Sequence, residues 1–435
     1  MPEESQRSEG GQPRGARRLT RRISATRRGV MLYFAILGPG LIAAIAGNDA
    51  GGIAVYSHVG AVFGYQLLWV LAIIAVSLIV IQLMSARMGA VTGKGLADLI
   101  REEFGIRWTA IAMLALLVAN GGTTIAEFAG IAASAELLGI SRYIAVPLMG
   151  LVVWLVVVRA SYRTAERVFL ILSAAFGVYF IAPFMTHPDW GYIARSTIAP
   201  SISVNADFLM AIIILVGTTI TPYMQLFVQS AVVDKGVTIR DYPFTRLDVI
   251  FGSIFAIAVA AFIIVTTGTI LHPAGIAVET AEDAATALAP LVGQYATILF
   301  AIGLFGASML AACVLPLSTA YALSEAFGWE RGVSKTFGEA PVFNGLYTGL
   351  IVLSVLVVLI PGLPLIGAII TSQFIDGLLL PVLLIFMLKL SNSREVMGNY
   401  VNGPVFNVIA WLTVIIIIAI SVVLLIVLVV GWMPI

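Results

Sequence analysis

Charged side chains are scarce in this chain: Asp, Glu, Lys and Arg make up 11% of its 435 residues, whereas 60% of the residues are hydrophobic. This composition excludes an ordinary soluble domain. Apolar runs of about 20 residues, the length that crosses a bilayer as a helix, recur along the whole sequence. The sequence therefore predicts a polytopic membrane protein that is surrounded by lipid and has no nucleic-acid partner.

Cysteine and histidine are almost absent. Cys313 is the single cysteine, which excludes a disulfide within the chain. The three histidines, His58, His187 and His272, fall at the ends of apolar runs, so they form no cluster of soft metal ligands. No nucleophile and base stand in a recognisable catalytic arrangement. We therefore expect neither an enzymatic activity nor a resident cofactor.

Eleven transmembrane spans fit the apolar runs, and no soluble domain interrupts them. The eighth run is too long for a single crossing, and we expect its excess as an amphipathic or cytoplasmic piece near 321–329. The polar, basic residues 1–30 predict a disordered cytoplasmic arm ahead of one membrane domain, 31–435. The expected spans are 31–57, 65–88, 108–138, 142–159, 167–186, 204–232, 247–271, 284–326, 342–360, 364–390 and 405–432.

The distribution of basic residues predicts how these spans are oriented. Cytoplasmic loops of membrane proteins carry an excess of Lys and Arg. With the N-terminus inside, Arg142 and Arg195 are the exceptions among 24 basic residues, and all the others fall on the cytoplasmic side. The outer loop between spans seven and eight carries only acidic charges, those of Glu279, Glu282 and Asp283. We therefore expect a cytoplasmic N-terminus and an extracytoplasmic C-terminus.

Two of the spans contain residues that interrupt a helix in the middle of the membrane. Span one has Gly-Asn-Asp-Ala-Gly-Gly at 47–52, and span six has three threonines and Pro222 within 217–223. Glycine, asparagine and proline weaken or break helices. Breaks that lie five spans apart indicate two five-helix halves, spans 1–5 and 6–10, of opposite topology. This inverted repeat is typical of secondary transporters, whose substrate lies between the two broken helices.

Oxygen-bearing side chains gather at these breaks. Asp49 places a carboxylate near the bilayer midplane, where a charge costs at least about 2.5 kcal/mol and indicates a functional site. An oxygen shell with one carboxylate suits a hard divalent ion such as Mg²⁺ or Ca²⁺, held partly hydrated in a wide cavity. The further oxygens on spans six and ten belong to Thr218, Thr221, Gln225, Ser372, Gln373 and Asp376.

Each of these side chains also has a structural interpretation. Asp49 would cap the second half of span one, and the threonines would bond to backbone groups that the break leaves free. Gln373 would form a hydrogen bond between helices. The acids near span ends are expected to be solvated or capping rather than ligands. They are Asp207, Asp248 and Asp376.

Several motifs resemble those of the NRAMP family of divalent-metal transporters. They lie at 38–40, 49–52 and 63–69 around span one, at 85–89 and 92–93 after span two, at 126–130 in span three, and at 372–373 and 380–381 in span ten. The resemblance implies an all-α, LeuT-like fold with broken helices 1 and 6. It also implies an ion site lined by Asp49, the Ala46 carbonyl, Thr218, Thr221 and Gln373, with Gly52 where the family has a ligand asparagine and with Asn48, Tyr223 and Glu127 as further cavity or relay residues.

The departures from the family concern metal selectivity and proton coupling. Thr221 and Tyr223 stand where the transition-metal carriers have Met and His, and the loss of the thioether removes a filter against hard ions. In this respect the chain is similar to the NRAMP-related magnesium transporters of prokaryotes. Glu127 is retained, as a relay group or as a neutral buried acid, and Tyr223 is expected to pack rather than to take part in the chemistry. Thr124 replaces the second acid of span three, and span nine has no basic residue, so a proton relay lacks its chain of titratable groups.

We therefore expect a monomeric transporter in the inner (plasma) membrane of a prokaryote. It would import partly hydrated Mg²⁺, with Mn²⁺ as a second candidate, by alternating access and without proton coupling. The alternative within transport is a Na⁺-coupled carrier of an amino acid or amine on the same fold, in which Asp49 pairs with an ammonium group. An alternative of another class is a gated ion channel, which would conduct far faster than a carrier turns over.

Overall fold

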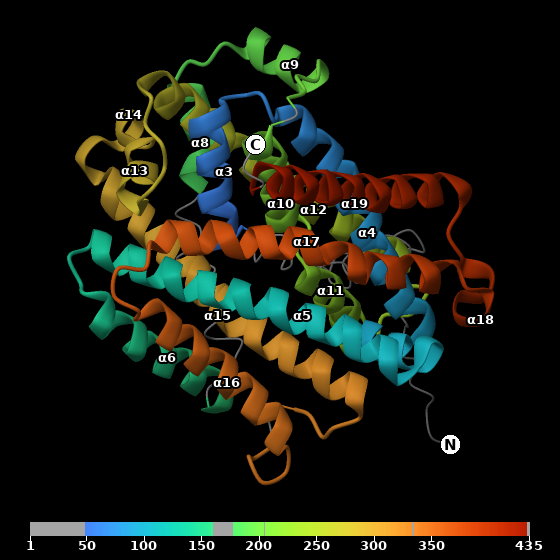
Figure 1. Ribbon diagram of the computed structural model, residues 1–435. Helices are drawn as coiled ribbons and strands as arrows, with labels where there is room; N and C mark the ends of the chain where they lie inside the picture. The colour runs from blue at the N-terminus through green and yellow to red at the C-terminus, as the bar shows by residue number, and fades with distance from the viewer. Residues whose placement is uncertain (1–47, 160–176, 204, 333–334, 433–435) are drawn as a thin grey trace, which may run out of the picture.

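The computed structural model describes residues 48–159, 177–203, 205–332 and 335–432, and every regular element in these ranges is a helix (Figure 1). The elements are α3 (Ala50–Phe63), α4 (Leu68–Thr92), α5 (Leu96–Leu137), α6 (Arg142–Arg159), α8 (Val178–Met185), α9 (Trp190–Ile198), α10 (Ala206–Thr219), α11 (Pro222–Asp234), α12 (Tyr242–Ala274), α13 (Ala281–Thr286), α14 (Ala289–Val292), η2 (Gly293–Tyr295), α15 (Ala296–Phe327), α16 (Pro341–Val358), α17 (Leu365–Asn392), α18 (Arg394–Met397), η3 (Gly398–Tyr400) and α19 (Pro404–Trp432).

The predicted spans coincide with helices. Eight helical stretches of the described chain are long and apolar enough to cross a bilayer, with α10 and α11 counted as one, and α3 and α6 are shorter apolar helices. The predicted spans 142–159 and 364–390, for example, correspond to α6 and α17. The basic arm, the beginning of span one and most of span five lie outside the described residues. The all-helical fold is thus confirmed, and the count of eleven spans stays a prediction.

The eighth predicted span, 284–326, is divided differently from what the sequence indicated. Its excess lies at the beginning, where α13, α14 and η2 precede α15. Gly293 has a φ of 54°, a left-handed conformation that favours glycine, and it turns the chain between α14 and α15. α15 continues without interruption through Tyr321 to Phe327, so the piece expected near 321–329 is the end of this helix, and its cytoplasmic place stays a prediction.

The long helix α5 is the centre of a helical bundle. α5 is 42 residues long and bends at Gly105, and α15 and α17 pack along it (Figure 1). α10 packs closely on α17 because each of the two helices places a glycine against the backbone of the other. A Cβ on Gly217 would lie 2.1 Å from the Gln373 carbonyl oxygen, and one on Gly377 would lie 2.4 Å from the Ile213 carbonyl oxygen. Such close approach of backbones is what small residues permit between membrane helices.

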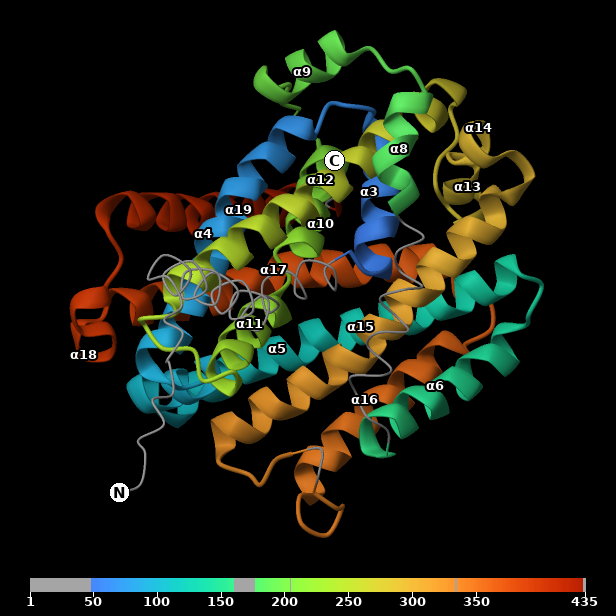
Figure 2. The same ribbon diagram turned by 180° about the vertical axis from the view of Figure 1, so that it is seen from behind.

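The predicted break in span six is present. Of the predicted break in span one, the structure describes only the C-terminal side, and that side agrees with the prediction. α10 and α11 are halves of one helix that is interrupted at Ile220 and Thr221, and Pro222 opens α11 at a position where no helical N–H is needed. α3 begins at Ala50, directly after an extended Asp49. α3, α10 and α11 meet in the middle of the molecule beside α17 (Figure 2). The two breaks therefore approach one another.

Candidate metal site

Asp49 lies buried at the point where α3 begins, with 1% of its surface exposed. Its Oδ1 accepts a hydrogen bond of 2.9 Å from the Gly52 N–H and so caps the helix. Its Oδ2 has no hydrogen-bond partner among the described residues. The capping role considered for Asp49 is therefore present, and it leaves one carboxylate oxygen for a second interaction.

Glu127 brings a second carboxyl group to the same turn. It projects from α5, is fully buried, and its Oε2 accepts a hydrogen bond of 3.3 Å from the Ala50 N–H. It interacts electrostatically with Asp49, and neither acid forms an ion pair with a described basic residue. Two buried carboxyls this close are tolerated only when a proton or a cation reduces their combined charge.

Of the three threonines at the second break, one has a structural role and two are available to contact an ion. Thr219 donates a hydrogen bond of 2.7 Å to the Leu215 carbonyl, and its hydroxyl lies 3.1 Å from that of Tyr56, so its role is structural. Thr218 and Thr221 are completely buried, and their hydroxyl oxygens have no partner within the described chain. A buried hydroxyl without a partner costs free energy, so these two are the ones that a bound ion would satisfy.

Gln373 of α17 lies over the first turn of α3. A Cβ on Gly51 would come within 2.3 Å of the Gln373 Nε2 and 3.1 Å of the Asp49 Oδ1. The Nε2 donates a hydrogen bond of 3.1 Å to Ser372 of the same helix, rather than to another helix. The Oε1 has no partner in the part of the chain that the structure describes. An amide oxygen is thus available close to the Asp49 carboxylate.

Tyr223 belongs to the first turn of α11, directly after the second break. Its hydroxyl is buried and interacts electrostatically with Asp49 and Glu127. It also lies near the Thr221 hydroxyl, but without the geometry of a hydrogen bond. The ring packs in an apolar cluster, as the sequence indicated, and the hydroxyl is subject to the charges of both carboxyls. Gln225 is buried with both amide atoms unpartnered among the described residues, and no contact relates it to Asp49.

Two of the acids that were expected to be solvated or capping are buried instead. Asp376 is completely buried instead of solvated, and its Oδ2 accepts a hydrogen bond of 2.6 Å from Thr123. Asp248 is buried as well, whereas Asp207 is exposed in the first turn of α10, as expected. A signal was available for Asp376, because it follows Gln373 by three residues and so lies near the same face of the helix.

The remaining predicted site residues add no side-chain ligand that the structure can place. Gly52 contributes its backbone N–H to the cap, Asn48 is partly buried at the edge of the described chain, and Ala46 lies outside the described residues. Among those described, no three His, Cys, Asp or Glu side chains converge to hold a metal ion.

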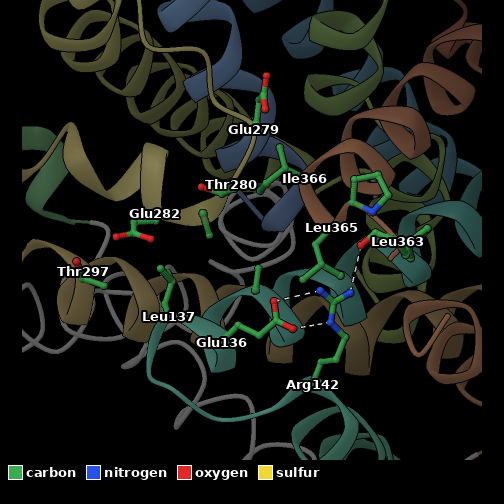
Figure 3. Close-up of a pocket in the computed structure, with 13 residues that line it drawn as sticks. Glu136, Leu137, Arg142, Glu279, Thr280, Glu282, Thr297, Leu363, Leu365 and Ile366 are labelled. Carbon is green, nitrogen blue, oxygen red and sulfur yellow. Dashed lines mark hydrogen bonds and ion pairs between the residues drawn. The ribbon is translucent and has the colours of Figure 1, made fainter. Parts of the chain in front are cut away.

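A cavity of about 540 Å³, here called the Glu136 cavity, opens at one end of α5 and α17 (Figure 3). Glu279 and Glu282 line it beside Glu136. The guanidinium of Arg142 donates hydrogen bonds to both oxygens of Glu136 and, at 3.1 Å, to the Leu363 carbonyl (Figure 3). Arg142 therefore ties the turn between α5 and α6 to the loop that precedes α17.

A second cavity, the Glu325 cavity, has a volume of about 230 Å³ and lies between α11 and α15. Asp234 and Glu325 line it together with Arg331, which forms an ion pair of 3.5 Å with Glu325. Phe227, which also lines it, is one turn of α11 beyond Tyr223. None of the buried oxygens around Asp49 lines either cavity, so neither cavity reaches this group.

Comparison with known proteins connects this arrangement to metal transport. The profile of the family described as natural resistance-associated macrophage protein-like (Nramp) matches residues 40–427. A divalent metal cation transporter MntH of Verminephrobacter eiseniae (strain EF01-2) is 28% identical over 422 residues, which cover 92% of this chain and 91% of that protein. The MntH of Granulibacter bethesdensis (strain ATCC BAA-1260 / CGDNIH1) is 27% identical over 429 residues, 94% and 92% of the two chains.

Two solved structures show the same fold. A crystal structure of an Eremococcus coleocola manganese transporter, in complex with an aromatic bis-isothiourea substituted compound, has a TM-score of 0.74 and 24% identity and covers 89% of this chain and 85% of that one. MhsT in complex with L-phenylalanine has a TM-score of 0.54 and 16% identity, with coverage of 90% and 97%. Both identities are low enough that these likenesses concern the fold alone, which is the LeuT-like architecture expected from the sequence.

Proposed function

The chain belongs to the natural resistance-associated macrophage protein-like (Nramp) family, and on that basis we propose that it imports Mg²⁺, with Mn²⁺ as a second substrate, by alternating access. As a member of this family it is a divalent metal transporter and not an enzyme. Membership of this family does not favour the alternative of a Na⁺-coupled carrier of an amino acid or amine. The likeness to MhsT concerns the fold alone and therefore does not support that alternative.

The observation that carries the assignment to Mg²⁺ is the oxygen chemistry at the second break. The unpartnered groups there, among the described residues, are the hydroxyls of Thr218, Thr221 and Tyr223 and the amide of Gln225. The nearest sulfur along the chain, that of Met224, accepts a hydrogen bond from Gln82 and packs against Ala311 in an apolar cluster. An oxygen site without a thioether offers a hard dication the ligands that it prefers, and Mn²⁺ also accepts such ligands.

The ligand count supports an ion that keeps part of its water. Asp49 supplies one free carboxylate oxygen, and Gln373 and the two threonines supply neutral ones. Mg²⁺ requires six near-ideal ligands and loses its water reluctantly. Gly52 has no side chain to complete the shell, so water molecules would fill the positions that the protein leaves open.

Transport without proton coupling is the second part of the proposal. Tyr223 stands in place of a histidine, and Thr124 donates a hydrogen bond of 2.7 Å to the Asn120 carbonyl, where it holds no titratable proton. α16 contains no basic residue. A potential of 100 mV drives a dication inward with about 4.6 kcal/mol, twice the value for one charge, so the membrane potential alone would concentrate Mg²⁺.

The direct test is Mg²⁺ uptake into proteoliposomes that contain a Mg²⁺-sensitive dye, with a pH dye in parallel vesicles and protein-free vesicles as the control. We expect saturable uptake that follows an imposed potential without acidification of the lumen. Acidification would contradict the absence of proton coupling. Mn²⁺ uptake without Mg²⁺ uptake would contradict the metal assignment. Dependence on a Na⁺ gradient would favour the amine carrier, and rates far above carrier turnover would favour a channel.

The orientation, location and oligomeric state belong to the same proposal. A cytoplasmic N-terminus and an extracytoplasmic C-terminus follow from the basic residues, of which Arg142 and Arg195 alone fall outside. This orientation makes the Glu136 cavity the outer one and the Glu325 cavity the cytoplasmic one. We propose a monomer in the inner membrane of a prokaryote, with 1–30 as a cytoplasmic arm and 31–435 as one membrane domain.

The hydrogen bonds from Arg142 to Glu136 and to the Leu363 carbonyl, here called the tie, can be tested by substitution. Its side chain and that of Glu136 are 18% and 38% exposed, and a pair exposed to this degree contributes about 0.5–1 kcal/mol. If the tie holds the outer side closed, we expect Arg142→Gln to change the maximal uptake rate by about two- to fivefold. Arg195→Gln, at the other outer arginine, is the matched control because Arg195 is exposed. Identical rates in both variants would exclude a gating role for the tie.

A further inference from the structure

Asp376 is a buried carboxylate that the site around Asp49 does not use. Its Oδ2 accepts its hydrogen bond from Thr123, whose hydroxyl also lies 3.1 Å from the Ala119 carbonyl. A hydroxyl has one proton to donate, so Thr123 serves one of these acceptors at a time. The Oδ1 of Asp376 has no partner in the described chain, and no described basic residue forms an ion pair with it.

The packing of α5 against α17 places Asp376 one layer beyond the Asp49 site. On α17, Asp376 lies three residues after Gln373, which is about 4.5 Å along the helix axis. On α5, its partner Thr123 lies four residues before Glu127, about 6 Å along that axis. Glu127 and Gln373 both contact the first turn of α3. Asp376 and Thr123 therefore form the next layer, displaced in one direction on both helices.

Unpartnered oxygens continue in that direction. The Tyr223 hydroxyl, buried and without a hydrogen-bond partner among the described residues, interacts electrostatically with Asp376 as well as with Asp49 and Glu127. Asn120, one turn before Thr123 on α5, is 1% exposed. Its Nδ2 donates to Thr319, and its Oδ1 has no partner in the described chain. Oxygen acceptors thus extend from the Asp49 layer past Asp376.

The charges in this region lack a counter-ion from the protein. Asp376 and Asp49 interact electrostatically, and neither pairs with an arginine, lysine or histidine of the described chain. Ionised groups at membrane depth occur where they bind one another or line an ion path. A divalent ion carries the charge that two carboxylates need, whereas a sodium ion neutralises one. Asp376 lies about one helical turn beyond Gln373, so an ion held near Gln373 has a charged group close by as it leaves the Asp49 layer.

We propose that Asp376 is a second carboxylate of the ion path, which receives the divalent ion from the Asp49 layer before the ion reaches the Glu325 cavity. The proposal rests on the proposed transport of a divalent ion. The Tyr223 hydroxyl interacts electrostatically with both acids, and Phe227, one turn further along α11, lines the Glu325 cavity. Asp376 therefore acts on the movement of the ion, while Asp49 determines whether the ion binds.

The test compares Asp376→Asn, which keeps the size of the side chain and removes its charge, with Asp376→Glu, which keeps the charge. Proteoliposome uptake of Mg²⁺ gives the maximal rate and the KM, and calorimetry on the purified protein gives Mg²⁺ binding. We expect Asp376→Asn to lower the maximal rate about tenfold or more while binding persists through Asp49. We expect Asp376→Glu to restore part of the rate. The exposed Asp207→Asn is the matched control.

Each outcome decides the proposal. Wild-type rates in Asp376→Asn would overturn it, and so would equal losses in the Asn and Glu variants of a monodisperse protein, because charge would then be irrelevant. If the Asn variant is not monodisperse, Asp376→Ser is measured in the same way. If the wild-type protein moves Mn²⁺ but not Mg²⁺, the magnesium assignment fails and the same comparison is made with Mn²⁺. If it moves no divalent ion, the proposed function and this inference both fail.

Discussion

Asp49→Asn will lower the initial rate of Mg²⁺ uptake by at least about 30-fold while leaving the protein folded. Asparagine caps a helix about as well as aspartate, so the hydrogen bond from the Gly52 N–H, which is 2.9 Å with Asp49, is retained. What disappears is the charge of a buried carboxylate at the ion site. Removing one member of a buried charged interaction costs about 2–5 kcal/mol, and 1.4 kcal/mol is a factor of ten.

The matched control is Asp189→Asn. Asp189 has the same local role at the start of α9, where its side chain accepts a hydrogen bond of 2.9 Å from the Tyr192 N–H, but it is exposed. We expect this variant to transport at the wild-type rate. Both proteins are measured as proteoliposomes after size-exclusion chromatography. Uptake by Asp49→Asn within a factor of two of the wild type would refute the assignment of Asp49 as the charged ligand.

Thr221→Met will reverse the preference between hard and soft ions. Thr221 is completely buried, and its hydroxyl has no partner among the described residues. The substitution replaces a hard oxygen by a thioether, which binds soft ions such as Cd²⁺ and disfavours Mg²⁺. Loss of one buried polar interaction costs about 1–3 kcal/mol, so we expect Mg²⁺ uptake to fall roughly tenfold or more. Competition by Cd²⁺ should rise in the same assay.

Two further variants separate the loss of oxygen from the gain of sulfur. Thr221→Ser keeps the hydroxyl and should keep Mg²⁺ uptake. Thr221→Val keeps the shape without the hydroxyl, and it should lose Mg²⁺ uptake without gaining sensitivity to Cd²⁺. An unchanged ratio of Mg²⁺ to Cd²⁺ transport in Thr221→Met would mean that selectivity arises elsewhere in the site. Wild-type Mg²⁺ uptake in Thr221→Val would remove the hydroxyl from the proposed ligands.

The candidate site could be predicted only in part. Asp49 and Thr221 were identified because each lies at a helix break, where the sequence itself indicates non-helical backbone. Asp376 was misassigned because it was judged by its distance from a span end, whereas its burial depends on α5 packing against it. The sequence predicts packing for Tyr223, and only the tertiary structure brings its hydroxyl under the electrostatic influence of Asp49 and Glu127.

The positions of the spans, the proline at the second break and the acid at the first were determined by the sequence, because apolar length, proline and glycine act locally. Tertiary structure decided which polar atoms remain without a partner. The Thr219 hydroxyl donates to a carbonyl of its own helix, but the Thr218 hydroxyl has no partner among the described residues. Glu127 reached Ala50 across 77 residues of chain, and Thr123 reached Asp376 across 253. Such pairings follow from how helices pack, which the local sequence pattern does not specify.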